Sequence, residues 1–182
     1  MFDLQGLNIY LIGMMGSGKS TIGPLLAKHL GYSFLDTDTT IERTVGKSVT
    51  EIFQTVGEAE FRQIETQVLA EVSAHLRLIV ATGGGIAIER ENWNHLHQGL
   101  VIWLDPDVDI LVERLQGDTT RPLLASADLP SKLATMLAER HHRYSEADIQ
   151  ISIDRDLTTE EIIDRILTAI PKVLKAPIAI PD

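Results

Sequence analysis

Cysteine is absent from the 182 residues of the chain, which excludes disulfides, thiolate metal sites and a cysteine nucleophile. Positive charge is also scarce, since 16 lysines and arginines stand against 26 aspartates and glutamates and give a formal net charge of −10. Such a chain has no basic face for a nucleic-acid backbone and little attraction to anionic membranes. We therefore expect no nucleic-acid or membrane partner, and we expect local arginines and backbone amides to hold any anionic ligand.

Long apolar stretches, repeats and linkers are missing as well. No run reaches the roughly 18 apolar residues that cross a bilayer, and no signal-type segment opens the sequence. With 44% apolar residues the chain can bury one core. We expect a cytoplasmic monomer with a single domain over residues 1–170, followed by an irregular, proline-containing tail over residues 171–182.

Five short apolar runs have the length of buried strands: residues 7–12, 32–35, 78–81, 100–104 and 149–153. Segments with a helical period lie between them, one from about Gly18 and another over residues 58–76. Ser48 and Glu51 form a capping-box signature for a short helix before the second segment. This alternation predicts an α/β fold of three layers, α/β/α, around a central five-stranded parallel sheet.

The ends of the predicted strands carry residues that are suited to polar ligands. In open parallel sheets, ligands bind beyond the carboxyl ends of the strands. The residues at the first four of these ends are Gly13, Asp36-Thr37-Asp38, Gly83-Gly84-Gly85 and Asp105-Pro106. The sequence therefore predicts the functional site at this edge of the sheet.

Residues 13–20 match the phosphate-loop pattern G-x-x-x-x-G-K-[ST], and they lie between an apolar run and a helical pattern, as that motif requires. Glycines let successive backbone amides curl around phosphate oxygens, and the following helix offers its positive end. Lys19 would reach the outer phosphates, and the Ser20 hydroxyl can bind Mg²⁺. The motif predicts a nucleotide-phosphate site.

A carboxylate near the Mg²⁺ is predicted at Asp36, as a direct ligand or as a residue of the metal's second shell. Asp105 is the alternative because it follows an apolar run, but Pro106 beside it favours a turn. Pro24 falls inside the helix that follows the phosphate loop, where it predicts a bend.

A second set of polar residues should converge on the same crevice. It comprises Asp36-Thr37-Asp38, the segment over residues 57–65, and Thr82 with the three glycines after it. Each part alone has an ordinary explanation, namely a turn or cap, a surface pair of Arg62 with Glu65, and a loop. Their order and spacing together are more specific than a phosphate loop alone.

Two further motifs, Arg121-Pro122-Leu123-Leu124 and Arg140-x-x-x-Tyr144, complete this pattern. With them the chain resembles the shikimate kinase family from the N-terminal strand to about Asp148. The resemblance implies a nucleoside-monophosphate-kinase-like P-loop NTPase fold with a mobile lid. It also implies transfer of the γ-phosphoryl group of ATP to the 3-hydroxyl of shikimate, with Mg²⁺.

The resemblance assigns catalytic roles to Lys19, Asp38 and Arg121. Asp38 would grip the substrate hydroxyls and act as the base for the attacking one. Arg121 would approach the phosphates from the lid, over about residues 116–128. The loop-forming residues of that segment independently favour a lid there. The substrate-binding region would span about residues 38–65.

The shikimate carboxylate would be clamped by Arg62 and Arg140, because a guanidinium fork matches a planar carboxylate. Glu65 would orient Arg62. The implied substrate contacts are Asp38, Arg62, Gly83, Gly84, Gly85 and Arg140.

Nucleotide contacts are implied on several segments. Ser20 and Asp36 would lie at the Mg²⁺, Arg114 beside the adenine, and the loop over residues 154–157 across the base. The implied nucleotide-binding set is Gly13, Met15, Gly16, Ser17, Gly18, Lys19, Ser20, Thr21, Arg114, Arg121 and Arg155.

Some alternatives stay open. Arg143 competes with Arg140 for the clamp, although the spacing to Tyr144 favours Arg140, and His142 stands where the family commonly has proline. A gluconate-type kinase shares the phosphate loop without the full second set. A catalytically silent relative that binds shikimate or nucleotide should have lost one of the three implied catalytic residues, which are all present.

Overall fold

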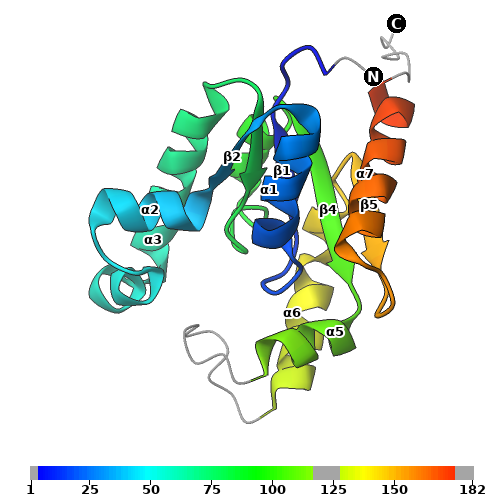
Figure 1. Cartoon of the computed structure of the whole chain (residues 1–182). Coiled ribbons are helices and arrows are strands. Elements are labelled where there is room, and N and C mark those ends of the chain that lie inside the picture. The colour runs from blue at the N-terminus through cyan, green and yellow to red at the C-terminus, as the bar shows by residue number, and fades with distance from the viewer. Residues whose placement is uncertain (1–3, 117–127, 175–182) are drawn as a thin grey trace, which may run out of the picture.

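The computed structural model describes residues 4–116 and 128–174, and its elements surround one central sheet (Figure 1). Its five strands are parallel and lie in the order β2-β3-β1-β4-β5. The strand bounds are β1 Ile9–Ile12, β2 Ser33–Asp36, β3 Leu78–Ala81, β4 Leu100–Pro106 and β5 Ile149–Ile153. The predicted α/β class and the five-stranded parallel sheet are therefore confirmed.

Helices cover both faces of the sheet. Ile9 and Leu11 of β1 belong to one core cluster, whereas Tyr10 and Ile12 belong to the other, because successive side chains of a strand point to opposite faces. The helix bounds are α1 Lys19–Leu30, α2 Thr37–Val45, α3 Val49–Ser73, η1 Arg90–Asn92, α4 Trp93–Leu96, α5 Val108–Leu115, α6 Leu129–Tyr144 and α7 Thr159–Leu174. Over the described ranges, none of these helices combines the length and the apolar character needed to cross a membrane.

The two cores separate the helices into layers. The cluster with Ile9 and Leu11 also holds the apolar sides of α1 and α7. The cluster with Tyr10 and Ile12 holds residues of α3, α4, α5 and α6. Side chains from these helices pack on opposite faces of the sheet, which gives the predicted α/β/α layers.

Helix α3 consists of two parts joined at a kink. Its capping box forms as predicted: the Ser48 hydroxyl accepts from the Glu51 amide, and the Glu51 carboxylate accepts from the Ser48 amide at 2.8 Å. Gly57 inside the helix has φ 83° and ψ 173°, a conformation that is essentially restricted to glycine. Helix α2 and the first part of α3 project away from the sheet (Figure 1).

Two prolines lie in regular structure where the sequence predicted a turn or a tail. Pro106 belongs to β4 and pairs with Ile153. The Asp107 amide donates to the Ile153 carbonyl on the β5 side of β4. The Pro106 nitrogen therefore faces the β1 side, where the pairing with β1 has already ended. Pro171 lies inside α7, which continues to Leu174. Burial of the isoleucine face of α7 offsets the missing backbone donor.

Two predicted segments fall wholly or partly outside the described residues. The lid predicted over residues 116–128 is described only at its two ends, and Arg121 lies in the undescribed part. The same holds for residues 175–182 of the predicted tail. The roles assigned to these residues stay predictions.

Candidate active site

The phosphate loop connects β1 to α1, and its lysine lies folded against it. Lys19 Nζ donates hydrogen bonds to the carbonyl oxygens of Gly13 at 2.8 Å and Met14 at 2.9 Å. A third bond reaches Ser17 Oγ at 3.3 Å. At Gly13, where φ is 138°, a Cβ would come within 2.5 Å of the Leu104 carbonyl oxygen, so only glycine fits there. The loop and its lysine are thus held against each other.

A cavity of about 440 Å³ lies against this loop. Arg114 of α5 reaches its wall and donates to the Gly16 carbonyl at 2.9 Å. The cavity is lined by Met15, Gly16, Ser17, Gly18, Lys19, Ser20, Thr21, Ile22, Asp36, Asp38, Thr82, Gly84, Arg114, Leu157, Thr159 and Ile162. Polar groups gather at the loop, whereas aliphatic side chains from the β5–α7 segment supply a wall against which a flat base can pack.

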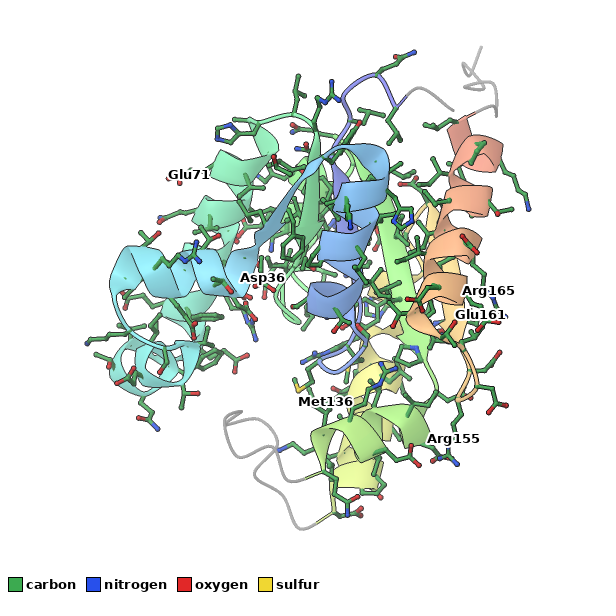
Figure 2. The ribbon with its side chains drawn as sticks, in the orientation of Figure 1. Asp36, Glu71, Met136, Arg155, Glu161 and Arg165 are labelled. Atoms are coloured by element: carbon green, nitrogen blue, oxygen red, sulfur yellow. The ribbon has the colours of Figure 1, made fainter. Side chains whose placement is uncertain are left out.

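The far wall of this cavity was only partly predicted. Leu157 lies in the loop that was expected to cover the base, but Thr159 and Ile162 of α7 carried no motif that could mark them. Arg155, also predicted to bind nucleotide, does not line the cavity. It pairs with Glu113 at 2.6 Å, with both side chains more than half exposed. Arg155 lies on the outer side of the segment between β5 and α7 (Figure 2).

Asp36 is placed to serve a cation together with Ser20. Asp36 lies at the end of β2, beside the start of α2 (Figure 2). The Ser20 hydroxyl donates to Asp36 Oδ2 at 2.6 Å, and Asp36 Oδ1 accepts from the amide of Thr39 at 3.1 Å. A hydroxyl and a carboxylate oxygen side by side fit Mg²⁺, which takes few protein ligands and keeps phosphates and waters as the others. Asp105 accepts instead from Gln150 at 2.7 Å and lines neither cavity, which favours Asp36 over it.

A second cavity, of about 490 Å³, opens beside the first. Five residues line both cavities: Met15, Ser20, Asp36, Asp38 and Gly84. The other lining residues are Thr39, Glu42, Ser48, Val49, Thr50, Phe53, Phe61, Arg62, Glu65, Gly85 and Arg140. The two cavities are therefore adjacent, and Asp38 lies at their common border.

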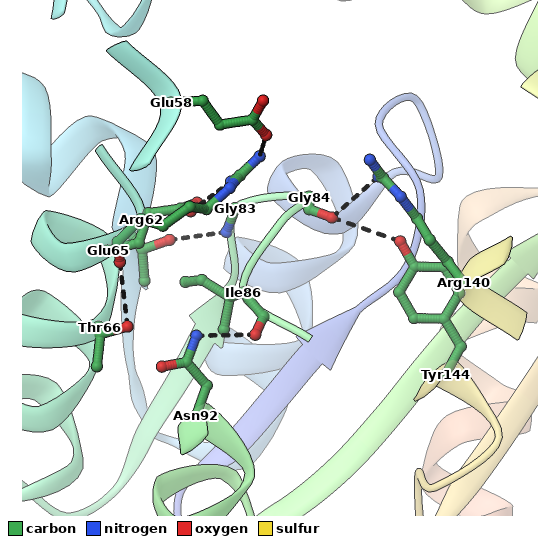
Figure 3. Close-up of polar contacts among 11 residues, drawn as sticks. Glu58, Arg62, Glu65, Thr66, Gly83, Gly84, Ile86, Asn92, Arg140 and Tyr144 are labelled. Carbon is green, nitrogen blue, oxygen red and sulfur yellow. Dashed lines mark hydrogen bonds and ion pairs between the residues drawn. The ribbon is translucent and has the colours of Figure 1, made fainter. Parts of the chain in front are cut away.

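Arg62 is held by two carboxylates and two aromatic rings. Its guanidinium pairs with Glu65, and with Glu58 at 3.0 Å (Figure 3). It also lies 5.7 Å from the ring centre of Phe53 and 5.6 Å from that of Phe61, within the range of cation–π attraction. Although burial alone would lower the pKa of Arg62, these carboxylates raise it, so the guanidinium stays charged.

Glu65 is only 1% exposed, and burial raises the pKa of its carboxyl to about 7. Arg62 opposes this rise, whereas the negative charges of Asp38 and Glu89 add to it. The ion pair with Arg62 favours the ionised carboxylate and alone would lower the pKa. Burial destabilises the ionised carboxylate by more than this ion pair stabilises it, so the pKa rises. Glu65 therefore exchanges a proton near neutral pH.

The loop after β3 brings glycines against the two arginines. Arg140 Nη1 donates to the Gly84 carbonyl at 3.2 Å (Figure 3), and the Arg62 guanidinium lies against Gly85. A Cβ at Gly85 would overlap that guanidinium. The Gly83 amide instead donates to Thr37 Oγ1 at 2.8 Å, and Gly83 lines neither cavity.

The two candidates for the second clamp arginine are clearly separated. Arg140 lines the second cavity, whereas Arg143 pairs with Glu146 at 2.9 Å and does not. The sequence did not single out Glu42, Ser48, Val49 and Thr50 as wall residues. They arrive through the turn between α2 and α3, where Glu42 Oε1 accepts from the Val49 amide at 2.9 Å.

Comparison with known proteins gives consistent matches over nearly the whole chain. The sequence profile described as "Shikimate kinase" matches residues 15–171. A shikimate kinase of Nostoc sp. is 56% identical over 94% of this chain and 95% of its own length. One of Nostoc punctiforme is 55% identical, with the same coverage of both chains.

Solved structures agree in fold. A shikimate kinase from Acinetobacter baumannii in complex with shikimate superposes with a TM-score of 0.89 at 36% identity, over 95% of this chain and 97% of that one. A gluconokinase from Sinorhizobium meliloti superposes with a TM-score of 0.55 at 19% identity, over 92% and 93% of the two chains. The second likeness concerns the fold alone.

Proposed function

The chain belongs to the shikimate kinase family, and we propose that its two joined cavities hold ATP and shikimate side by side during phosphoryl transfer. The chain is an ATP-dependent kinase that phosphorylates shikimate. One observation carries the assignment of the sites: Asp38, Ser20 and Gly84 line both cavities. The acceptor and the phosphoryl donor can then meet without diffusing through water.

The cavity against the phosphate loop takes the nucleotide. The backbone of the loop and Lys19 face the β- and γ-phosphates, Arg114 lies beside the base, and Leu157 and Ile162 pack against it. Ser20 and Asp36 would hold Mg²⁺, which would neutralise negative charge on the phosphates. Lys19 must exchange its bonds to the loop carbonyls for bonds to phosphate oxygens.

The second cavity takes shikimate. Arg62 and Arg140 approach it from opposite elements, α3 and α6, and together they clamp the substrate carboxylate. Asp38 lines the same cavity, and we place the ring of the substrate between the two arginines and this carboxylate. The 3-hydroxyl is thereby presented to the nucleotide.

The transfer step needs a base for the acceptor hydroxyl and positive charge around the transferring phosphoryl group. Asp38 accepts the proton of the 3-hydroxyl, the hydroxyl oxygen bonds to the γ-phosphorus, and the bond from that phosphorus to the β–γ bridging oxygen breaks to release ADP. Lys19 lies at the loop and stabilises the charge on the transferring group, with Arg121 added from the lid segment. Most of the acceleration comes from positioning and charge, since phosphoryl transfer asks for little covalent help.

We assign the cytoplasm as the location and the monomer as the working form, because nothing in the sequence pattern demands an interface.

A gluconate-type acceptor is disfavoured by the cavity itself. Two arginines, together with two glycine amides that no acceptor takes within the described residues, match a carboxylate bound to a rigid ring better than a flexible polyol acid.

The deciding experiment is a coupled assay of ADP release with MgATP and one acceptor at a time: shikimate, gluconate or a nucleoside monophosphate. Release with shikimate alone is the expected result. Asp38→Asn should keep the fold and nucleotide binding but lower kcat at least about a hundredfold, as loss of a general base does. Near-normal turnover of this variant would remove the base role, and release with another acceptor would overturn the assignment of the second cavity.

A further inference from the structure

The peptide between Gly84 and Gly85 has two polar groups that face opposite ways. No peptide bond of the described chain is cis, so the Gly84 carbonyl and the Gly85 amide point in opposite directions. The Gly83 amide is taken by Thr37. Within residues 4–116 and 128–174, no acceptor takes the amide of Gly84 or Gly85, and both residues line the second cavity.

The carbonyl of that peptide is held by two side chains of α6. Arg140 Nη1 donates to it at 3.2 Å and the Tyr144 hydroxyl at 3.5 Å, from one side of the glycine loop (Figure 3). Arg140 and Tyr144 are four residues apart and therefore lie on the same helix face. The direction of the Gly85 amide is fixed through the carbonyl at the other end of its peptide.

Tyr144 is unusually well placed to hold a fixed position. Its side chain is fully buried, and its ring packs against Trp103 with 5.6 Å between ring centres. Burial raises the pKa of the Tyr144 hydroxyl, while Arg140 lowers it, so the hydroxyl stays protonated and able to donate. A long hydrogen bond from a rigid ring is weak, but it does not depend on a flexible side chain.

We infer that Tyr144 is a positioning residue for shikimate, which it serves by keeping the Gly84–Gly85 peptide turned so that its amide faces the substrate carboxylate. This inference rests on the proposed use of the second cavity. Arg140 has to turn part of its guanidinium toward that carboxylate when the substrate arrives. Tyr144 then keeps a donor on the Gly84 carbonyl, and the peptide does not rotate.

The test compares two conservative variants of buried tyrosines. Tyr144→Phe keeps the ring against Trp103 and removes only the hydroxyl. Tyr10→Phe is the matched control, since Tyr10 is equally buried in the same core cluster. Its ring approaches Gly99, just before the first residue of β4, and so lies at the opposite edge of the sheet.

For Tyr144→Phe we expect KM for shikimate to rise about three- to tenfold, the range of one lost hydrogen bond, with kcat and KM for MgATP within twofold of wild type. Tyr10→Phe should leave all three constants within twofold. An unchanged KM for shikimate, or an equal rise of both KM values, would overturn the inference. Wild-type protein that fails to phosphorylate shikimate would instead overturn the proposed function on which it rests.

A double-mutant cycle with Arg140→Lys separates a shared carbonyl from two independent contacts. If both side chains hold the Gly84 carbonyl, removing the second donor leaves it free to turn. The double variant should then lose more affinity for shikimate than the product of the two single losses. A loss equal to that product would show that Tyr144 and Arg140 act separately. It would contradict the proposal that both side chains hold the Gly84 carbonyl.

Discussion

Glu65 is almost fully buried and also has a direct charge partner, Arg62. Its neighbours explain why its carboxyl is neither a simple ion-pair partner nor a simple neutral acid. Arg62 favours the ionised form, and burial with the nearby Asp38 favours the protonated form. The sequence predicted Glu65 as the residue that orients Arg62, but its burial depends on helix packing that no local motif encodes.

The first prediction concerns the pH dependence of stability. The folded state raises the pKa of Glu65 from 4.5 to about 7, so between these values it holds a proton that the unfolded chain releases. The free energy of unfolding of wild type should therefore fall relative to that of Glu65→Gln as pH rises from about 4.5 to about 7, by at most about 3 kcal/mol. Urea unfolding at pH 5, 6, 7 and 8 measures this difference. Glu60→Gln, an exposed change in the same helix, is the control, and parallel curves for wild type and Glu65→Gln would contradict the prediction.

The second prediction separates damage to function from damage to the fold. In Gly85→Ala the new Cβ overlaps the Arg62 guanidinium, which has to swing away from Glu65; Glu65 then becomes protonated, so KM for shikimate should rise at least about tenfold with a smaller loss of stability than in a core variant. In Gly23→Ala the new Cβ overlaps the ring of Phe34 between α1 and β2, which should cost about 1–3 kcal/mol of stability without changing KM. Thermal unfolding and kinetics on both variants give the comparison. The reverse pattern would mean that Arg62 does not need its place beside Gly85.

At the residue scale, the sequence predicted those site members that stand in a dense motif. Lys19, Asp38, Arg62 and Arg140 are predicted site residues that line the two cavities of the structure. Arg155 does not, because a lone arginine in a loop carries no information on its direction, and here a surface carboxylate takes it. Gly83 lies behind the cavity wall, since only the structure reveals that Thr37 uses its amide.

At the scale of elements, α3 has the most unusual geometry. Gly57 bends it so that Phe53 of the first part and Phe61 of the second approach to 4.4 Å between ring centres. These rings flank Arg62 and line the second cavity. The bend therefore shapes the wall that we assign to shikimate.

The third prediction tests this bend. Gly57→Ala should lose about 1–3 kcal/mol of stability, because a side chain strains the backbone at φ 83° and ψ 173° although nothing within 4 Å obstructs it. Relief of that strain moves the rings apart, so KM for shikimate should rise severalfold while KM for MgATP stays. Gly31→Ala, at the positive-φ end of α1, is the control that loses stability alone. Equal effects of both variants on KM would contradict a role of the bend in the cavity.

The strands were predictable because a strand that is buried on both faces reads as a short apolar run, and β3 and β5 have the bounds that the sequence indicated. The prolines were misjudged because their effect depends on the neighbours. Pro106 is tolerated in β4 where β1 no longer lies alongside, and Pro171 is tolerated in α7 because packing of the isoleucines outweighs a lost backbone bond. Neither neighbour is visible in the local sequence.

At the scale of the whole molecule, the order of the sheet brings the site together. Strand β1 with the phosphate loop lies centrally, and β3 with the glycine loop and β2 with Asp36 follow on one side. Segments far apart in the chain thus meet at one edge. The convergence could be predicted from the parallel sheet, but the division into two cavities with a common wall could not, because side-chain packing decides it.

The fourth prediction uses ligand-induced stabilisation of the whole fold. A ligand that binds only the folded state stabilises it by about 2.7 kcal/mol at a hundred times its Kd. Arg140→Ala should lose the rise in Tm caused by shikimate and keep the rise caused by MgATP, whereas Arg143→Ala should keep both. Differential scanning fluorimetry with each ligand measures these shifts. A retained shikimate shift in Arg140→Ala would remove Arg140 from the clamp.

The common wall of the two cavities also bears on inhibitor chemistry. Met15, Ser20, Asp36, Asp38 and Gly84 border both spaces, so the two cavities lie side by side. Two separate ligands each lose translational freedom when they bind. A single compound that joins a nucleotide phosphate to a cyclic carboxylate would lose this freedom only once. For a short linker this corresponds to an effective concentration in the millimolar range for the second half. Such a tethered compound should therefore bind far more tightly than either half, and its optimal linker length would report the gap between the two sites in solution.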